Sequence, residues 1–181
     1  NTFKMKVVYY GYREWSFKIF NKLKTTDKYL ITHKDYEVIE KIKPDLVFFV
    51  GWSDMIPKDI IDNNLCVCLH PSPLPLYRGG SPIQNQLLRN EKSSMVSLFI
   101  MDNGVDTGDI IFQSPISLEG ELDDIFNDIV NEGIKGVNFT VDNFNKIPII
   151  RKKQDSSIAS FFNRLKPGDS EIKSDELIKY S

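Results

Sequence analysis

Cysteine is scarce in this sequence. The chain of 181 residues contains two cysteines and two histidines, and the cysteines, Cys66 and Cys68, are separated by a single residue. Two cysteines so close on one strand do not reach the geometry of an unstrained disulfide. Such sparing use of cysteine is typical of proteins from a reducing compartment, so we expect a cytoplasmic protein without disulfides.

The sequence also lacks a long hydrophobic run and an excess of charge of either sign. No apolar stretch approaches the roughly 20 residues that a membrane-spanning helix needs, and the start of the chain has no signal-peptide pattern. With 23 basic and 25 acidic residues, the formal net charge is -2, which gives no overall attraction to nucleic acid. We therefore expect neither a membrane nor a nucleic acid as partner, although a local basic patch is compatible with this composition.

No Gly-x-Gly-x-x-Gly pattern is present, which argues against a dinucleotide site. The first apolar run ends instead in "YYGYREW", from Tyr9 to Trp15. This turn follows an expected strand, and ligands of open α/β sheets bind beyond the ends of such strands. Arg13 within the turn can pair with a phosphate, or it can be an ordinary solvated side chain.

Short apolar runs alternate with segments of helical periodicity along most of the chain. The runs "DLVFFVGW" and "LCVCLH" are continuous and of strand length, as in strands buried on both faces of a parallel sheet. Ser16 and Ser81 are the expected caps of two helices between the strands. This alternation predicts an α/β fold with an open, mostly parallel, twisted sheet and helices on both faces. We expect one main domain over residues 5–150 and a short C-terminal extension over residues 151–181.

The densest cluster of special residues is "CVCLHPSPLPLYRGGSP", from Cys66 to Pro82. Cys66, Cys68 and His70 would share one face of a strand, but same-face neighbours lie about 6.5–7 Å apart, too far to converge easily on one zinc ion. We therefore expect no metal, and we interpret the cysteines as small buried hydrophobic residues. His70 stands where the strand ends, at the edge where such sheets bind ligands. It is either a proton-transfer group or a turn residue bonded to the backbone.

A second cluster, "MDNGVDTGD" from Met101 to Asp109, has three aspartates and two glycines between apolar strands. It is either an ordinary turn, or one aspartate faces the same pocket as His70 and forms a proton-transfer pair with it. Spacing does not select the aspartate. A third segment, "VGWSDMIP", offers an apolar surface after a strand. This segment is either core or one wall of a pocket for a planar heterocycle.

Together, "HPSPLPLYRGGSPIQNQLL" and "FIMDNGVDTGDII" resemble the N10-formyltetrahydrofolate-dependent formyltransferases. The signature of that family is Asn-x-His, then Ser, Leu-Pro and a Tyr/Trp-Arg-Gly loop, with an aspartate in a later turn; His70 and Asp106 match it. The resemblance implies that His70 stabilises the oxygen that becomes negative during formyl transfer. Asp106 would orient His70 and help to take the proton of the attacking amine. Cys68 replaces the family asparagine at the third catalytic position, and a thiol is a weaker hydrogen-bond donor than an amide.

The same resemblance guides the expected ligand contacts. N10-formyltetrahydrofolate, the expected co-substrate, would lie against Trp52, Ser53, Met55, Ile56, Pro57, Met101 and Asp102. The acceptor substrate is expected at Tyr10, Arg13, Tyr77, Arg78 and Gly79. A glycine in this loop would let the backbone approach a ligand closely.

Within the family, the sequence is most similar to the short sugar-nucleotide N-formyltransferases. Methionyl-tRNA formyltransferase carries a further C-terminal barrel and a basic surface, and glycinamide ribonucleotide formyltransferase carries an early Gly-x-Gly-Ser-Asn; we expect neither here. The tail "RLKPGDSEI", from Arg164 to Ile172, is similar to the sugar-nucleotide enzymes. The expected reaction is formylation of a UDP- or dTDP-linked 4-amino-4,6-dideoxy sugar, a step of glycan biosynthesis. The alternatives are formylation of another small amine, or folate or nucleotide binding without turnover because of Cys68. A homodimer is the assembly we consider beside a monomer.

Overall fold

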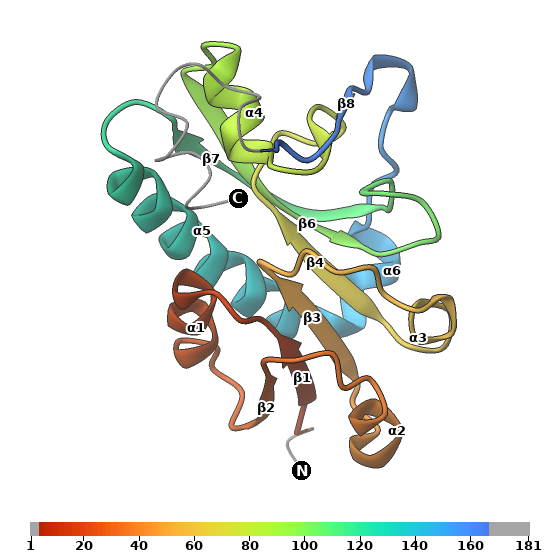
Figure 1. Cartoon of the computed structure of the whole chain (residues 1–181). Helices are drawn as coiled ribbons and strands as arrows, with labels where there is room; N and C mark the ends of the chain where they lie inside the picture. Colours follow the sequence, from red (N-terminus) through yellow and green to blue (C-terminus); the bar gives the residue numbers. More distant parts are fainter. Residues whose placement is uncertain (1–3, 167–181) are drawn as a thin grey trace.

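The computed structural model describes residues 4–166, and within them a six-stranded sheet forms the centre of the molecule (Figure 1). The strands are β1 (Lys6–Tyr10), β2 (Asp27–Ile31), β3 (Leu46–Val50), β4 (Cys66–His70), β6 (Ser93–Ile100) and β7 (Ile110–Ser117). In the spatial order β2-β1-β3-β4-β6-β7, the first four are mutually parallel, and β6 and β7 are antiparallel to their preceding neighbours. The predicted open, mostly parallel sheet is confirmed.

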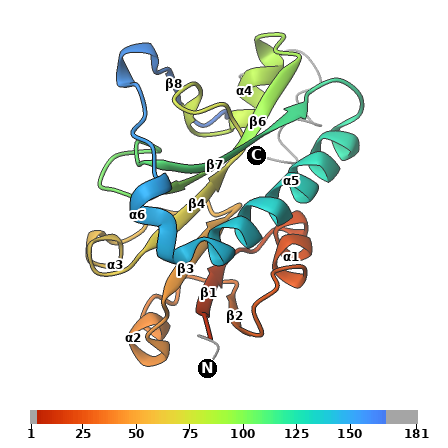
Figure 2. The same ribbon diagram turned by 180° about the vertical axis from the view of Figure 1, so that it is seen from behind.

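Helices cover both faces of this sheet, as Figures 1 and 2 show. They are α1 (Glu14–Asn21), α2 (Val38–Ile42), α3 (Lys58–Asn63), α4 (Pro82–Leu88), α5 (Leu122–Asp142) and α6 (Ile147–Ile150), with 3-10 turns at Phe144–Lys146 and Ser156–Ile158. The core on one face includes Ile19 of α1 and Ile129 of α5. The core on the other face includes Ile39 of α2 and Ile60 of α3. No helix within residues 4–166 has the length and apolar character to cross a membrane.

The segment after α6 belongs to the same folded unit as the sheet. Lys152 forms an isolated antiparallel bridge with Ile110 at the start of β7. Further on, β8 (Phe161–Phe162) pairs in parallel with β5 (Arg78–Gly79), a two-residue strand in the loop that follows β4. These contacts join the predicted extension to the predicted main domain, and the boundary at residue 150 stays a prediction. Residues 167–181 of the predicted extension lie outside the described residues.

The two predicted serine caps do not form. α1 begins at Glu14, so Ser16 lies inside the helix, where its hydroxyl donates to the Val50 carbonyl at 2.9 Å. Ser81 does precede α4, but its backbone is left-handed, with φ of 44°, and its side chain makes no capping bond. Its hydroxyl accepts instead from the Leu165 N–H at 3.1 Å. Both hydroxyls bond to segments distant in the sequence, which a local pattern cannot reveal.

Candidate active site

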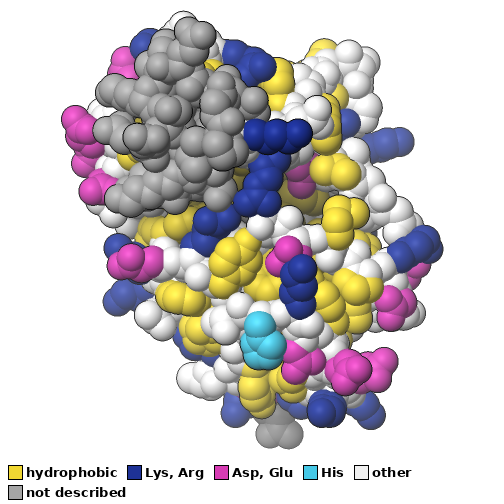
Figure 3. Space-filling view, in the orientation of Figure 1, with side chains coloured by type: hydrophobic (Ala, Val, Ile, Leu, Met, Phe, Trp, Pro, Cys, Tyr) yellow, Lys and Arg dark blue, Asp and Glu magenta, His cyan; other side chains and the backbone are white. Residues whose placement is uncertain are grey.

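A cavity of about 550 Å³ opens beyond the carboxyl ends of β1, β3 and β4. Arg13, Gly51 and His70, which follow or end these strands, contribute to its lining. The loop after β6 and the segment 161–164 also line it. In Figure 3, hydrophobic side chains lie across the middle of this face of the molecule, with basic side chains among them. The cavity therefore lies where an open α/β sheet ordinarily binds its ligand.

His70 is held in one orientation by the backbone of the loop that follows it. Only 6% of the residue is exposed, and its Nε2 lies 2.8 Å from the Tyr77 carbonyl oxygen. Because a carbonyl can only accept a hydrogen bond, Nε2 carries the hydrogen, and Nδ1 of the neutral ring is unprotonated. Nδ1 lies 3.6 Å from Oδ2 of Asp106. Nδ1 is thus the nitrogen that can gain a proton and share it with this carboxylate.

Asp106 reaches His70 from a strained turn. Its backbone is left-handed, with φ of 57°, a conformation that aspartate tolerates better than most residues. The Gly79 N–H donates to Oδ2 of Asp106 at 2.8 Å, and 16% of the side chain is exposed. The residues Tyr77 to Gly79 therefore bond to both members of the pair, through a carbonyl on one side and an N–H on the other.

The other two aspartates of this turn have different partners. The Asp102 carboxylate accepts from the Gly104 N–H at 3.0 Å and from the Thr107 hydroxyl at 2.6 Å. The Asp109 carboxylate pairs with the Arg151 guanidinium at 2.7 Å. Of the three aspartates that the sequence left open, Asp106 is the one that the structure pairs with His70.

The proline-rich loop is fixed by side chains from three other elements, of which Gln86 and Ser97 are buried. Gln86 of α4 donates to the Pro71 carbonyl at 2.9 Å, and Ser97 of β6 donates to the Ser72 carbonyl at 2.7 Å. Gln113 of β7 donates to the Leu74 carbonyl at 3.1 Å. Because these bonds satisfy carbonyls of residues 71–74, which precede β5 and have no regular secondary structure, they hold the residues after His70 in one conformation.

Two predicted substrate contacts are core residues instead. Tyr10 is fully buried, and its hydroxyl donates to the Asp35 carbonyl at 2.6 Å. Tyr77 is also buried, with its ring stacked on Phe162 at 5.0 Å between centroids. Neither side chain lines the cavity. Tyr77 contributes through its carbonyl group rather than its ring.

Arg78 does not face the cavity either, although the sequence suggested a substrate contact. Its guanidinium is buried and donates to Oε1 of Gln154 at 3.0 and 3.1 Å and to the Ser156 hydroxyl at 3.2 Å. The two remaining predicted substrate contacts, Arg13 and Gly79, do line the cavity. Contact of these two residues with a substrate stays a prediction.

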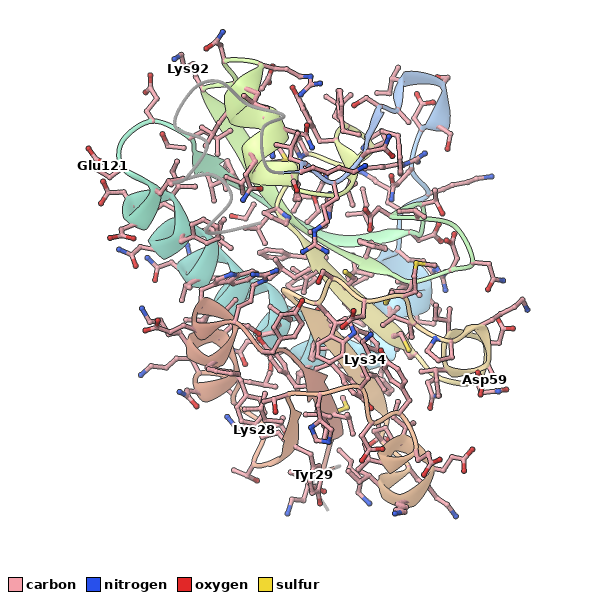
Figure 4. All side chains as sticks on the ribbon, in the orientation of Figure 1. Lys28, Tyr29, Lys34, Asp59, Lys92 and Glu121 are labelled. Atoms are coloured by element: carbon pink, nitrogen blue, oxygen red, sulfur yellow. The ribbon has the colours of Figure 1, made fainter. Side chains whose placement is uncertain are left out.

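Most of the residues predicted to contact the co-substrate line the cavity, and their contact with it stays a prediction. Those that line the cavity are Trp52, Ser53, Met55, Ile56, Met101 and Asp102, whereas Pro57 does not and instead precedes α3. The Trp52 ring is fixed by an N–H bond to the Tyr36 hydroxyl at 3.2 Å. Met55 is 85% exposed, so its side chain is available to a ligand. Next to these residues, Asp54 pairs with Lys34, which is labelled in Figure 4, at 3.2 Å.

Cys68 also lines the cavity, where it is half-buried. Burial, with a smaller contribution from the negative charge of Asp106, raises the pKa of its thiol well above the ordinary value. Because only a thiolate is a strong nucleophile, Cys68 is unsuited to covalent catalysis. At neutral pH it is a neutral thiol that can act as a weak hydrogen-bond donor.

We expect iodoacetamide to alkylate Cys68 slowly. The raised pKa of Cys68 lowers its thiolate fraction at pH 8, so the reaction should be at least about tenfold slower than with free cysteine. Peptide mass spectrometry of a Cys66→Ala variant, which leaves one cysteine, measures the rate. Alkylation as fast as that of free cysteine would contradict a protonated thiol.

The segment that the sequence assigned to the extension also contributes to the site. Gln154 bonds to the loop after His70, and Arg164 lines the cavity. Arg164 was part of the tail motif that is similar to the sugar-nucleotide enzymes, but the motif predicted no role for its side chain. Residues 167–172 of that motif lie outside the described residues. Nothing in the sequence around Gln154 distinguishes it from a polar surface residue, so sequence reasoning missed it.

Comparisons with known proteins show what this chain is similar to. A family model described as "Formyl transferase" matches residues 13–132. The methionyl-tRNA formyltransferase of Finegoldia magna is 30% identical over 155 residues, covering 83% of this chain and 50% of that protein. The chain spans about half of the length of the curated relatives it matches.

Solved structures give the same fold. A methionyl-tRNA formyltransferase from Clostridium thermocellum superimposes with a TM-score of 0.78 and 29% identity, covering 97% of this chain and 81% of that chain. An N-formyltransferase from Helicobacter canadensis, solved with folinic acid and dTDP-3-aminofucose, has a TM-score of 0.69 and 16% identity, covering 97% and 80%. Because the family model matches more than half of the sequence, this chain belongs to the formyl transferase family.

Proposed function

We propose that this protein transfers the formyl group of N10-formyltetrahydrofolate to a primary amine. The observation that carries the proposal is the His70–Asp106 pair, whose Nδ1 and Oδ2 atoms are 3.6 Å apart, in the lining of the cavity. Membership of the formyl transferase family supports the class of reaction. The pair supports it independently, because formyl transfer to an amine needs both a donor for a negative oxygen and an acceptor for a proton.

The cavity fits the folate co-substrate. Its volume of about 550 Å³ is within the range of about 300–1,000 Å³ common for small-molecule sites. One wall of the cavity is apolar and includes Trp52, Ile56 and Met101, so a flat pterin can lie on it. His70 supplies a polar group in the same lining. When bound, the folate would supply the formyl group.

His70 and Asp106 have complementary tasks in this reaction. The Nε2 hydrogen of His70 is engaged by the Tyr77 carbonyl, so Nδ1 is the atom that gains a proton. The Asp106 carboxylate beside Nδ1 stabilises the positive ring that results. The carboxylate can take the proton that the attacking amine loses and pass it to the adjacent Nδ1, which then is a charge-assisted donor for the oxygen that becomes negative.

For the acceptor, we favour the amine of a nucleotide-linked deoxyamino sugar. Arg13 and Arg164 both line the cavity, and guanidinium groups suit phosphate oxygens. The fold is shared with an N-formyltransferase solved with dTDP-3-aminofucose, so this architecture is compatible with such an acceptor. The absence of a nucleic-acid partner, the cytoplasmic location and a homodimer stay predictions.

Methionyl-tRNA is the second candidate acceptor, because the curated relatives are methionyl-tRNA formyltransferases. The expectation of no C-terminal barrel does not exclude this acceptor, since the chain spans about half of those relatives. The net charge of -2 does not exclude a tRNA acceptor either, because a chain with this charge can still carry a local basic patch.

Release of tetrahydrofolate, followed by absorbance, tests the proposal. The purified protein is mixed with N10-formyltetrahydrofolate and, separately, with UDP- and dTDP-linked 4-amino-4,6-dideoxy sugars and with methionyl-tRNA. We expect release with one sugar nucleotide. Release with methionyl-tRNA alone would keep formyl transfer and replace the acceptor, whereas no release with any acceptor would reject the proposal.

Cys68→Asn distinguishes slow catalysis from binding without turnover. Asparagine restores a firm amide donor where the chain has a weak one. If the wild-type protein releases tetrahydrofolate, Cys68 is tolerated and the variant is expected to be at least as fast. A wild-type protein that binds the folate but is silent, with turnover gained in Cys68→Asn, would establish the binding-only alternative.

Arg164→Ala is expected to weaken binding of the acceptor substrate and to leave binding of the folate unchanged. A charge-assisted hydrogen bond to phosphate contributes about 1.5–3 kcal/mol, so KM for a sugar nucleotide should rise about 10- to 100-fold. KM for N10-formyltetrahydrofolate should stay unchanged. Arg151→Ala is the control, because Arg151 pairs with Asp109 and does not line the cavity. An unchanged KM for the acceptor would exclude Arg164 from the substrate site.

A further inference from the structure

Gln154 is a buried side chain that joins the two segments on which the His70–Asp106 pair depends. Only 6% of the residue is exposed. Its Oε1 accepts two hydrogen bonds from the Arg78 guanidinium, at 3.0 and 3.1 Å. Its Nε2 donates to the carbonyls of Asp106 at 2.9 Å and Gly108 at 2.7 Å. An amide offers two acceptor sites and two donors, so every site on this side chain is used.

On one side, Gln154 bonds to Arg78, the middle residue of the segment 77–79. We call this segment the bridge, because it bonds to both His70 and Asp106. Tyr77 accepts from His70, and Gly79 donates to Asp106. Arg78 lies between them, and of the three hydrogen bonds that its side chain makes within residues 4–166, two go to Gln154. Because the guanidinium is buried, it has little water with which to replace these bonds. The position of the bridge therefore depends on Gln154 in addition to the backbone pairing of β5 with β8.

On the other side, Gln154 fixes the turn that carries Asp106. The two carbonyls that it engages, those of Asp106 and Gly108, flank Thr107. The turn already lies tightly on the sheet, because a Cβ on Gly108 would be 1.6 Å from the Ile100 carbonyl oxygen. One amide thus ties the Asp106 turn to the loop that orients His70.

We propose that Gln154 is a positioning residue that sets the separation of Asp106 and His70. It does not line the cavity, so it acts through Arg78 and through the backbone of the Asp106 turn rather than on a substrate. The inference rests on the proposed function for its kinetic readout, but its spectroscopic readout needs no substrate.

Two variants separate the bonds of Gln154. Gln154→Met keeps the length of the side chain and removes all four hydrogen bonds. Gln154→Glu keeps an acceptor for Arg78 but turns a second oxygen towards the two carbonyls, so it breaks the tie to the Asp106 turn. The matched control is Asn138→Leu, since Asn138 is a buried amide with the same 6% exposure. It bonds to the backbone of Lys22 and Lys24.

The expected kinetic result is a loss in kcat without a comparable change in KM. A displacement of the order of 1 Å can cost about 100-fold in rate, so we expect both Gln154 variants to lose about 10- to 100-fold in kcat. Asn138→Leu is expected to keep the wild-type kcat, even where its melting temperature falls. A general loss of stability would affect the three variants alike, which is what the control excludes.

The expected spectroscopic result concerns the His70 ring. The sequence has two histidines, so nitrogen NMR of the imidazole rings resolves them, and a His33→Gln variant assigns the signals. The wild-type His70 should show a protonated Nε2 and an unprotonated Nδ1 in its neutral form. In Gln154→Met these signals should shift or broaden, because the Tyr77 carbonyl and the Asp106 carboxylate are no longer held together. In Asn138→Leu they should not.

Wild-type His70 signals and wild-type kcat in a folded Gln154→Met protein would overturn the inference. An equal loss of kcat in Asn138→Leu would also overturn it. If Gln154→Met does not fold, Gln154→Glu supplies the same two readouts. If the wild-type protein releases no tetrahydrofolate with any acceptor, the proposed function fails, and the NMR comparison alone decides on Gln154.

Discussion

Replacing His70 with alanine is expected to lower kcat by about 10²–10³-fold. His70 is the side chain whose Nδ1 can donate to an oxygen that becomes negative, because its Nε2 is engaged by the Tyr77 carbonyl at 2.8 Å. A methyl group cannot replace that donor. The measurement is tetrahydrofolate release at saturating concentrations of both substrates, so that the loss is read in kcat.

The control for this prediction is His33→Ala, which removes the exposed histidine and should leave kcat unchanged. His70→Ala also leaves the buried Tyr77 carbonyl without a partner, which costs about 1–3 kcal/mol of stability. The assay therefore runs well below the melting temperature of the variant. If the variant keeps kcat within about tenfold of the wild type, His70 is only a turn residue, the alternative that the sequence left open.

The sheet was predictable because each of its central strands is a short, continuous apolar run in the sequence. All five residues of β3 are buried, and they form one continuous apolar run, as a central parallel strand requires. β4 is read in the same way, with its last residue, His70, at the edge of the sheet. Strand identity and the location of the cavity both follow from these short runs.

The partner of His70 was predictable only from the resemblance to a family. β6 runs antiparallel to β4, so its carboxyl end lies beside Cys66, where the Met101 N–H donates to the Cys66 carbonyl at 2.8 Å. That is the opposite end of β4 from His70. Asp106 reaches His70 because the turn after β6 folds back towards the loop after β4. The spacing of residues within the turn, Met101 to Asp109, does not predict this path of the backbone.

Side-chain directions in the loop were less predictable still. An arginine beside a glycine in a cavity loop suggests a substrate contact, yet Arg78 turns inward to a glutamine 76 residues away in the sequence. The partner comes from a segment that composition alone marks as a polar tail. Long-range pairing of two polar side chains leaves no local signal, so the positioning network was visible only in the structure.

Asp106→Asn is expected to lower kcat by about 10²–10⁴-fold while keeping the fold. Asparagine has the same size and tolerates the left-handed backbone at this position, where φ is 57°. Its side-chain oxygen can still accept from the Gly79 N–H, now at 2.8 Å from Oδ2. What the substitution removes is the negative charge beside His70 and the group that takes the amine proton. When melting temperature and kcat are both measured, kcat should therefore fall while the melting temperature stays that of the wild type.

Asp109→Asn is the matched control, because it removes a carboxylate from the same turn. Asp109 pairs with a partly exposed Arg151, and such a pair contributes only about 0–1 kcal/mol to stability. Its kcat should remain that of the wild type. If Asp106→Asn is equally active, the carboxylate serves only to receive the Gly79 N–H, and the acceptor of the amine proton lies elsewhere. If Asp106→Asn is inactive while Asp109→Asn is not, the charge itself is required, since the hydrogen bond and the backbone are unchanged.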